Sequence, residues 1–324
     1  MAETVLSIDN LCVTYKNKRK QVYAVKNASF AIEKGDALGI VGESGSGKST
    51  LAMALLRLLP ERTAIVSGKA DFLGRDLITL GDKELSELRW KELAVVFQKA
   101  MSSFSPVHRI GEQIDDIYRV HNPKAQKGEA KERAIELLKL VNLGERVWKL
   151  YPHELSGGML QRVAIAMSLL FNPRLLIMDE ATTALDVVTQ GQLLNEIKRM
   201  EDTMDMTRIM ITHDMSVVAA SCNKVAVMYA GDIVEVGPVK KVLKTPAHPY
   251  TQGLLGSFPS LKGETKALRA IPGSIPDLSR HYDECIFAPR CPHATDACRK
   301  ARPETVQVGE GWSARCILCG GEKA

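Results

Sequence analysis

A short run of glycine, serine and lysine is the first feature of this sequence that could do chemistry. Residues 42–49 read GESGSGKS, which fits the spacing G-x-x-x-x-G-K-[ST] at every position. Glycines let backbone N–H groups turn inward around phosphates, and a following helix adds the positive end of its dipole. We therefore predict that Lys48 contacts the β- and γ-phosphates of a nucleotide and that the Ser49 hydroxyl binds Mg²⁺. The loop residues expected to bind the nucleotide are Ser44, Gly45, Ser46, Gly47, Lys48, Ser49 and Thr50.

Two apolar segments flank this loop. Residues 37–41 (ALGIV) form a continuous apolar run, which predicts a strand covered on both faces. After the loop, Leu51, Leu55 and Leu58 recur at helical spacing. The motif requires this strand, loop and helix order, which disfavours the alternative of a chance glycine-rich turn.

A second apolar run ends in two carboxylates. Residues 175–178 (LLIM) are followed directly by Asp179 and Glu180. We predict that Asp179 holds Mg²⁺, mainly through water, and that Glu180 accepts a proton from an attacking water. The alternative is a solvated strand end, which the phosphate loop upstream disfavours.

A pair of glycines precedes another apolar helical run in the segment 155–162 (LSGGMLQR). Glycines at a helix start expose backbone N–H groups, which suits a second phosphate-binding surface. Taken alone, the segment is equally an ordinary loop. Its position between the phosphate loop and the acidic strand favours the phosphate-binding role.

The elements that position these residues follow from hydrophobic periodicity. Residues 1–245 alternate apolar strand-like runs with amphipathic helices, which is typical of an α/β domain with a largely parallel sheet. Residues 129–141 predict a surface helix, and the surrounding region of about 100–170 predicts a helical subdomain. Residues 246–324 are richer in Pro, Gly and Ser at first and then in cysteine, which predicts a linker and a small C-terminal extension.

Composition limits the class of protein. The 324 residues are 45% hydrophobic, enough for one large or two smaller cores, and the net charge of +5 is too small to indicate a nucleic-acid binder. The start, MAETVLSIDN, does not resemble a signal peptide. The longest nearly apolar stretch, 163–171, is shorter than the roughly 20 residues that cross a bilayer. We expect any membrane role to come through a partner.

Cysteines are placed unevenly. Of the seven cysteines, five crowd the last forty residues, and such a local cluster in an intracellular chain indicates a metal or cluster site more than disulfides. Four thiolates hold zinc or an iron–sulfur cluster. The first three, Cys285, Cys291 and Cys298, lack the close spacing of zinc knuckles, whereas Cys316 and Cys319 have it. Zinc and reduced thiols without metal therefore remain alternatives.

The order of the motifs resembles the ABC ATPase family, of which LSGG is the signature. This resemblance implies a P-loop NTPase (RecA-like) cassette with antiparallel β and helical subdomains. It also implies two catalytic residues besides Glu180. Gln98 looks like the Q-loop glutamine, a sensor of Mg²⁺ and water beside the transporter contact, and His213 looks like the switch histidine that contacts the γ-phosphate.

Further binding residues follow from the same resemblance. Tyr15 matches the aromatic residue that stacks on adenine, with Tyr23 as the alternative, and residues 184–186 (ALD) match the D-loop. The signature residues would contact the γ-phosphate bound to the opposite subunit of a cassette dimer. These residues are Ser156, Gly157 and Gly158.

Four stretches are similar to the ATP-binding subunits of dipeptide/oligopeptide importers: GESGSGKST, MSSFSPVHRIGEQI, ATTALDVVTQ and AHPYTQGLL. The tail FAPRCPHATDAC also resembles theirs, which carry a 4Fe-4S cluster. The resemblance implies Cys285, Cys291, Cys298 and Cys316 as cluster ligands, and leaves Cys319 spare.

The resemblance implies an ATPase on the cytoplasmic face of the cell membrane that uses ATP and Mg²⁺ to power peptide import. Its implied partners are transmembrane permease subunits, a homologous second ATPase subunit or a second copy, and an extracellular substrate-binding protein. An oligosaccharide or metal-chelate cargo is an alternative. A soluble ABC ATPase acting on nucleic acid is another, disfavoured because no heptad run interrupts residues 50–155.

Overall fold

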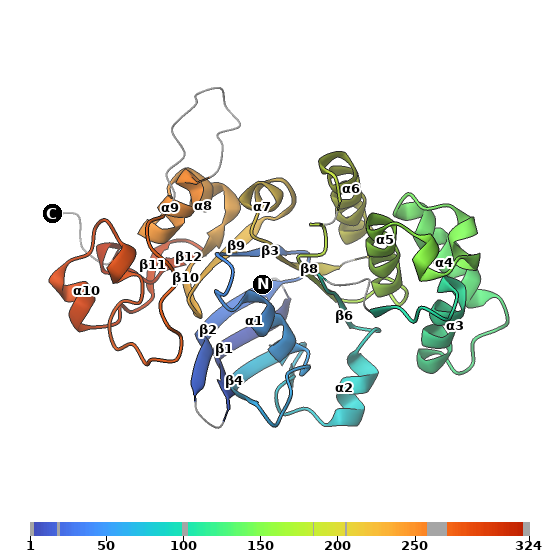
Figure 1. Cartoon of the computed structure of the whole chain (residues 1–324), viewed down its shortest axis with the longest axis horizontal. Coiled ribbons are helices and arrows are strands. Elements are labelled where there is room, and N and C mark those ends of the chain that lie inside the picture. Colours follow the sequence, from blue (N-terminus) through green and yellow to red (C-terminus); the bar gives the residue numbers. More distant parts are fainter. Residues whose placement is uncertain are drawn as a thin grey trace. The chain divides into compact units, whose positions relative to one another are not determined.

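The chain folds into two units, each built from segments that are distant in sequence. Figure 1 labels the helices and strands and colours them by their position along the chain. The structure is a computed structural model and describes residues 3–17, 20–98, 103–183, 185–204, 206–257 and 271–319. Unit 1 consists of Met1–Val5, Glu33–Gly35 and Leu80–Met210. Unit 2 consists of Leu6–Ile32, Asp36–Thr79 and Ile211–Ala324.

Unit 2 has a buried parallel strand pair at its centre. Strand β3 (Ala37–Val41) pairs in parallel with β9 (Lys224–Tyr229), and all five residues of β3 are buried. The apolar run ALGIV is therefore the buried strand that its composition predicted. Strand β10 (Asp232–Pro238) pairs antiparallel with β9.

The C-terminal strands extend this sheet. Strand β12 (Trp312–Ala314) pairs antiparallel with β10, and β11 (Val306–Gly309) pairs antiparallel with β12. The apolar residues Tyr250 and Phe287 pack into the same core cluster as Tyr229 of β9. The C-terminal extension thus shares a core with the strands of unit 2, as expected for a segment too short to bury a core of its own.

An antiparallel sheet, the second β element of the implied cassette, has the strand order β2-β1-β4-β5. Its strands are β1 (Thr4–Lys16), β2 (Gln21–Glu33), β4 (Ala64–Phe72) and β5 (Arg75–Asp76). The helices of unit 2 are α1 (Lys48–Leu55), α7 (Met215–Ser221), α8 (Val239–Lys244), α9 (Pro249–Gly256) and α10 (Asp296–Lys300). Short 3₁₀ turns span Ala288–Arg290 and Ile317–Cys319.

Unit 1 combines a short sheet with helices. Strands β6 (Leu93–Val96) and β7 (Leu175–Asp179) are parallel, and β8 (Thr207–Ile211) lies beside β7. Helix α4 (Glu129–Leu140) packs against α3 (Ile110–His121) and α5 (Gly157–Ser168) in the region predicted to be helical (Figure 1). The other helices of unit 1 are α2 (Asp82–Leu88), α6 (Val187–Met204) and the 3₁₀ segments Glu145–Lys149 and Pro152–Glu154. Among the helices that the structure describes, none has the length and apolar character to span a bilayer.

Candidate nucleotide-binding site

The phosphate loop lies between β3 and α1 of unit 2, pressed against neighbouring backbone. Gly42 and Gly47 have φ angles of 156° and 101°, in the region that favours glycine. A Cβ atom on Gly42 would lie 2.0 Å from the carbonyl oxygen of Met228, and one on Gly47 would lie 2.2 Å from that of Ala24. Only glycine therefore fits at these two positions of the loop.

Lys48 is the first residue of α1, and its side chain folds back into the loop. Its ammonium donates to the carbonyl oxygens of Gly42 at 2.9 Å and Glu43 at 3.0 Å. The helix start leaves first-turn N–H groups without intrahelical acceptors, which is the arrangement that binds phosphates. Ser44 and Ser49 are exposed around this helix start. The geometry thus suits the phosphate-binding role that the motif predicted.

Tyr15 lies next to the helix that follows the loop. Its phenol oxygen is 3.4 Å from the hydroxyl of Thr50 in α1. Tyr23 instead packs edge-on against His281, with ring centroids 5.9 Å apart. Of the two aromatic candidates, Tyr15 is the one that contacts the helix of the phosphate loop.

His213 follows β8 and is exposed at a junction between a strand and a helix. The residue before it, Thr212, donates its N–H to the carbonyl of Ile40 in β3 at 3.1 Å. The residue after it, Asp214, caps α7 by accepting the N–H of Ser216 at 2.8 Å. Both neighbours of His213 are thereby bonded, and its backbone is held beside the strand that leads into the phosphate loop.

In unit 1, the parallel pairing of β6 and β7 brings two predicted catalytic side chains together. Both strands end at the same edge of the sheet, and Gln98 Nε2 donates to Glu180 Oε2 at 2.7 Å. Glu180 has a φ of 47°, uncommon for a residue with a side chain and frequent at functional sites. Asp179 precedes it at the buried end of β7, with 5% of its surface exposed. The carboxylate predicted to activate water is therefore adjacent in the chain to the buried carboxylate predicted to bind Mg²⁺.

The signature segment forms the N-terminus of α5. Ser156 caps the helix, since its hydroxyl oxygen accepts the N–H of Met159 at 3.3 Å. Gly157 and Gly158 are the first two residues of the helix and are partly exposed. Their N–H groups have no intrahelical acceptor and, without side chains above them, are open to an anion.

The segment that matches the D-loop precedes α6. The Asp186 carboxylate accepts the Thr189 hydroxyl at 2.6 Å and the N–H groups of Val188 and Thr189. The bonds to Thr189 hold the pKa of Asp186 below its ordinary value. Ala184 lies outside the described residues. The residues predicted for the nucleotide site thus fall into two groups. The phosphate loop, Tyr15 and His213 belong to unit 2, whereas Gln98, the acidic strand end, the signature and the D-loop segment belong to unit 1.

Three residues that matter to the phosphate loop were missed from sequence: Glu43, Tyr250 and Arg290. Glu43 occupies a variable position of the loop motif, and Arg290 contacts it from 247 residues away. No spacing rule links residues so far apart. The only available signal was the mismatch of a charged arginine in an otherwise apolar stretch, IFAPRCP.

The predicted cluster cysteines are close enough to interact electrostatically. Burial, and to a smaller extent the thiols of Cys298 and Cys316, raise the pKa of Cys285 to about 11. Burial likewise raises the pKa of Cys291. Among the described residues, however, no three His, Cys, Asp or Glu side chains form a group that could hold a metal ion. Neither a 4Fe-4S cluster nor a zinc site is therefore shown, and the ligand assignment stays a prediction.

Comparison with known families agrees with the motif order. Residues 25–183 match the family described as ABC transporter. Residues 234–298 match the family described as oligopeptide/dipeptide transporter, C-terminal region. The second match covers the part of the chain that contains α9, Arg290 and the first three cysteines of the C-terminal extension.

Individual relatives align along nearly the whole chain. The oligopeptide transport ATP-binding protein OppD of Escherichia coli (strain K12) is 46% identical over 307 residues, 93% of this chain and 90% of OppD. The probable peptide ABC transporter ATP-binding protein y4tR of Sinorhizobium fredii is 42% identical over 319 residues, 97% of this chain and 95% of its own. The solved dimer of the ATP-binding cassette MJ0796, in a post-hydrolysis state bound to ADP and Pi, is 30% identical with a TM-score of 0.66, covering 72% of this chain and 98% of the cassette. The chain therefore belongs to the ATP-binding subunits of the oligopeptide/dipeptide family of ABC transporters.

Proposed function

We propose that the chain binds and hydrolyses ATP on the cytoplasmic face of a membrane and so powers the import of dipeptides or oligopeptides. The observation that carries this proposal is the hydrogen bond of 2.7 Å between Gln98 and Glu180 at the ends of two parallel strands. This bond orients the Glu180 carboxylate, a group of the kind that activates water. The names of the relatives OppD and y4tR support the peptide cargo.

The hydrolytic step assigns one task to each side chain. Glu180 accepts a proton from the attacking water, a role that contributes about 10²–10⁴-fold to rate. Gln98 orients the carboxylate and the water, and Lys48 neutralises the phosphate oxygens. His213 contacts the γ-phosphate, and Tyr15 stacks on the adenine ring.

Magnesium would be held by oxygen donors, which this ion prefers. The candidates are the exposed Ser49 hydroxyl on the first turn of α1, the Asp179 carboxylate and the Gln98 amide oxygen. A buried acid such as Asp179 at a strand end fits a cation better than it fits an apolar core. When bound, Mg²⁺ neutralises charge that develops on the phosphates.

We further infer a cassette dimer. The N-terminus of α5, capped by Ser156, would bind the γ-phosphate held by a second cassette, either a homologous subunit or a second copy. The related cassette MJ0796 is a dimer. Transmembrane permease subunits would transmit the motion, and an extracellular substrate-binding protein would deliver the cargo.

The test of this proposal replaces the base. Glu180→Gln keeps the shape of the side chain and removes its basicity, so ATP turnover should fall at least about 100-fold while ATP still binds. Glu61→Gln, at an exposed carboxylate in a turn of unit 2, is the matched control and should keep full turnover. Near-normal hydrolysis by Glu180→Gln would remove Glu180 from its role.

The cargo is tested separately. Co-expressed with its permease subunits, the chain should co-purify with membranes and support uptake of a labelled dipeptide or oligopeptide. Uptake of an oligosaccharide or a metal chelate instead would replace the peptide cargo. Tight, salt-sensitive DNA binding without membrane association would favour a nucleic-acid ATPase.

The cysteines of the extension belong to the same proposal. We infer that Cys285, Cys291, Cys298 and Cys316 supply four thiolates to a 4Fe-4S cluster, as the similarity to importer tails implies. What supports the grouping is that Cys285 N–H donates to the carbonyl of Cys298 at 2.9 Å, which holds two of the four close together. Zinc and metal-free thiols are the competing outcomes.

A further inference from the structure

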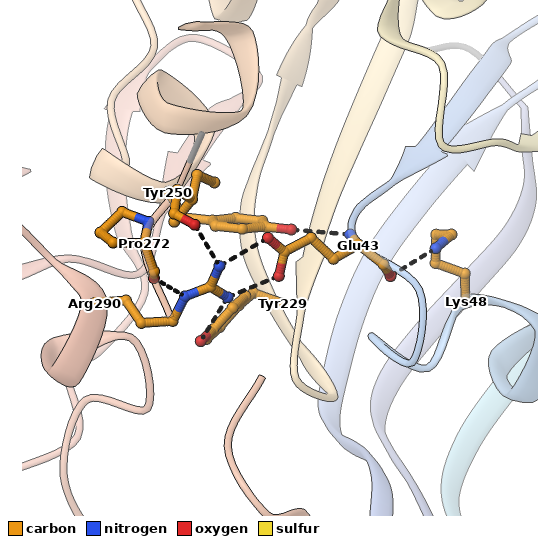
Figure 2. A network of polar contacts seen from close by, with 7 residues as sticks. Glu43, Lys48, Tyr229, Tyr250, Pro272 and Arg290 are labelled. Carbon is orange, nitrogen blue, oxygen red and sulfur yellow. Dashed lines mark hydrogen bonds and ion pairs between the residues drawn. The ribbon is translucent and has the colours of Figure 1, made fainter. Parts of the chain in front are cut away.

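Every polar group of Glu43, a residue inside the phosphate loop, is bonded within unit 2. Its N–H donates to the phenol oxygen of Tyr250 at 2.9 Å, and its carbonyl accepts the Lys48 ammonium at 3.0 Å. Its carboxylate accepts two bonds from the Arg290 guanidinium, at 2.7 and 2.9 Å. Figure 2 shows Glu43 bonded to Lys48 on one side and to Arg290 on the other. The residue thus joins the phosphate-binding lysine to the C-terminal extension.

Arg290 is fixed by its own surroundings. Its side chain is only 6% exposed, and its Nε donates to the carbonyl of Pro272 at 2.8 Å. A second donor reaches the carbonyl of Ile271, and the guanidinium lies 5.6 Å from the ring centroid of Tyr229. The bonds to Glu43 raise the pKa of Arg290, so its charge is permanent. The fixed, charged guanidinium of Arg290 therefore binds the Glu43 carboxylate through two hydrogen bonds.

Tyr250 is equally immobile. It is fully buried in helix α9, and its ring packs against those of Tyr229 and Phe287 at centroid distances of 4.6 and 5.4 Å. Burial raises the pKa of Tyr250, so the hydroxyl stays neutral and accepts the Glu43 N–H as a phenol. The extension thus holds the loop through two side chains of different chemistry.

We propose that Arg290 and Tyr250 are positioning residues for the phosphate loop, through which the C-terminal extension sets the affinity for the nucleotide. The inference rests on the proposed binding of ATP by this loop. Lys48 and the loop N–H groups bind phosphates only while the loop keeps its turn, and Glu43 is where the extension attaches to that turn. Arg290 also neutralises a carboxylate that would otherwise repel the negatively charged triphosphate.

The experiment measures the Kd of the non-hydrolysable analogue AMP-PNP, with Mg²⁺, for the full chain by calorimetry. Arg290→Gln should raise Kd by about 10-fold, within the usual range for coupled sites. Tyr250→Phe deletes one acceptor without changing the ring, and should raise Kd by about 5-fold. For ATP hydrolysis both variants should raise KM and leave kcat nearly unchanged, because they act on binding rather than on the chemical step.

A double variant tests whether the effect passes through Glu43. Arg290→Gln alone leaves the Glu43 carboxylate unneutralised, so adding Glu43→Gln should recover part of the lost affinity. Arg290→Lys keeps the charge but not the two-pronged geometry, and should bind with intermediate affinity. The controls are Arg299→Gln, at an exposed arginine of α10, and Tyr282→Phe, which deletes a hydroxyl bonded to the carbonyl of Asp277. Both should bind like the wild type.

Each outcome is decisive. Unchanged Kd in folded Arg290→Gln and Tyr250→Phe, while Lys48→Ala loses binding, would overturn the positioning role and leave the proposed function intact. If Tyr282→Phe lost as much affinity for AMP-PNP as Tyr250→Phe, the effect would be a general destabilisation of the extension, and the positioning role would be overturned. If Arg290→Gln does not fold, as judged by its thermal transition, Tyr250→Phe carries the test alone. A wild-type chain that does not bind AMP-PNP would overturn the proposed function itself.

Discussion

The side-chain amide of Gln98 donates to the carboxylate of Glu180 with 2.7 Å between Nε2 and Oε2, although 82 residues separate the two in sequence. The contact exists because β6 and β7 are parallel neighbours whose carboxyl ends meet at one edge of the sheet. Residues that follow adjacent parallel strands are commonly brought together in this way. The bond fixes the direction of the carboxylate that we propose as the general base.

Replacing Gln98 tests this relationship. Gln98→Ala removes the donor that orients Glu180 and leaves the base itself in place. The kcat should therefore fall by about 10-fold, less than the roughly 10²–10⁴-fold contributed by the group that accepts the proton. Steady-state ATP hydrolysis, followed by phosphate release, measures the change. Gln126→Ala, at an exposed glutamine ahead of α4, is the control. Equal rates for Gln98→Ala and the wild type would show that the bond has no catalytic role.

The Lys48 side chain gives a prediction about binding. Its ammonium is buried in the loop, and Lys48→Ala deletes a charged partner of the phosphates that is present in the ground state. The Kd for AMP-PNP should therefore rise by about 10- to 100-fold, the range for hydrogen bonds to charged groups. Lys83→Ala, at an exposed lysine of α2, should bind normally. Retained affinity in Lys48→Ala would place the phosphates elsewhere.

His248 makes stability depend on pH. It is 2% exposed, its Nδ1 accepts the N–H of Tyr250 at 3.0 Å, and burial lowers its pKa to about 3 from the ordinary 6.5. Because the folded pKa is depressed, only the unfolded chain binds a proton between pH 6.5 and 3. The contribution of the neutral His248 ring to the free energy of unfolding is fully present above pH 6.5. It is lost as the pH falls from 6.5 towards 3, by about 1.4 kcal/mol per pH unit.

Urea unfolding at pH 7 and pH 5 measures this effect. His248→Asn keeps a side-chain acceptor and removes the titration, so the wild type should lose about 2 kcal/mol more than the variant between the two pH values. His293→Asn, at an exposed histidine of the extension, should behave like the wild type. Parallel pH dependence in the wild type and His248→Asn would contradict a buried neutral imidazole.

The cysteines give the last prediction. Protein purified without oxygen should be brown, with about four irons and four sulfides per chain, if the extension binds a 4Fe-4S cluster. Replacing any one of the four ligands with serine should abolish the brown colour, whereas Cys319→Ser should keep it. The four ligands are Cys285, Cys291, Cys298 and Cys316.

Other results would redirect this assignment. Colourless anaerobic protein with one zinc per chain would refute the cluster. Bleaching in Cys319→Ser, with Cys316→Ser still brown, would keep the cluster and move its fourth ligand. The kcat for ATP hydrolysis should largely survive loss of the cluster, because the proposed catalytic residues all precede residue 215, whereas any disturbance of Arg290 should appear in KM.

Local features of this protein follow from the order of residues along the chain. The run ALGIV is buried on both faces because every side chain is apolar, and the loop after it needs glycine where φ is positive or the backbone approaches closely. The helix predicted at 129–141 forms as α4 because its apolar residues recur at helical spacing. These features involve interactions between residues a few positions apart, so a motif contains the information for them.

The contacts that complete the site depend on tertiary packing. The meeting of Gln98 with Glu180 requires the pairing of β6 with β7, and the meeting of Glu43 with Arg290 requires the extension to fold onto the core around Tyr229. The hydrophobic effect that drives such packing is non-directional, so residue types alone do not specify which distant segments meet. The cysteine spacing shows the same limit, since it supplies candidate thiolates without specifying whether they converge on one point, and among the described residues no metal-binding group is seen.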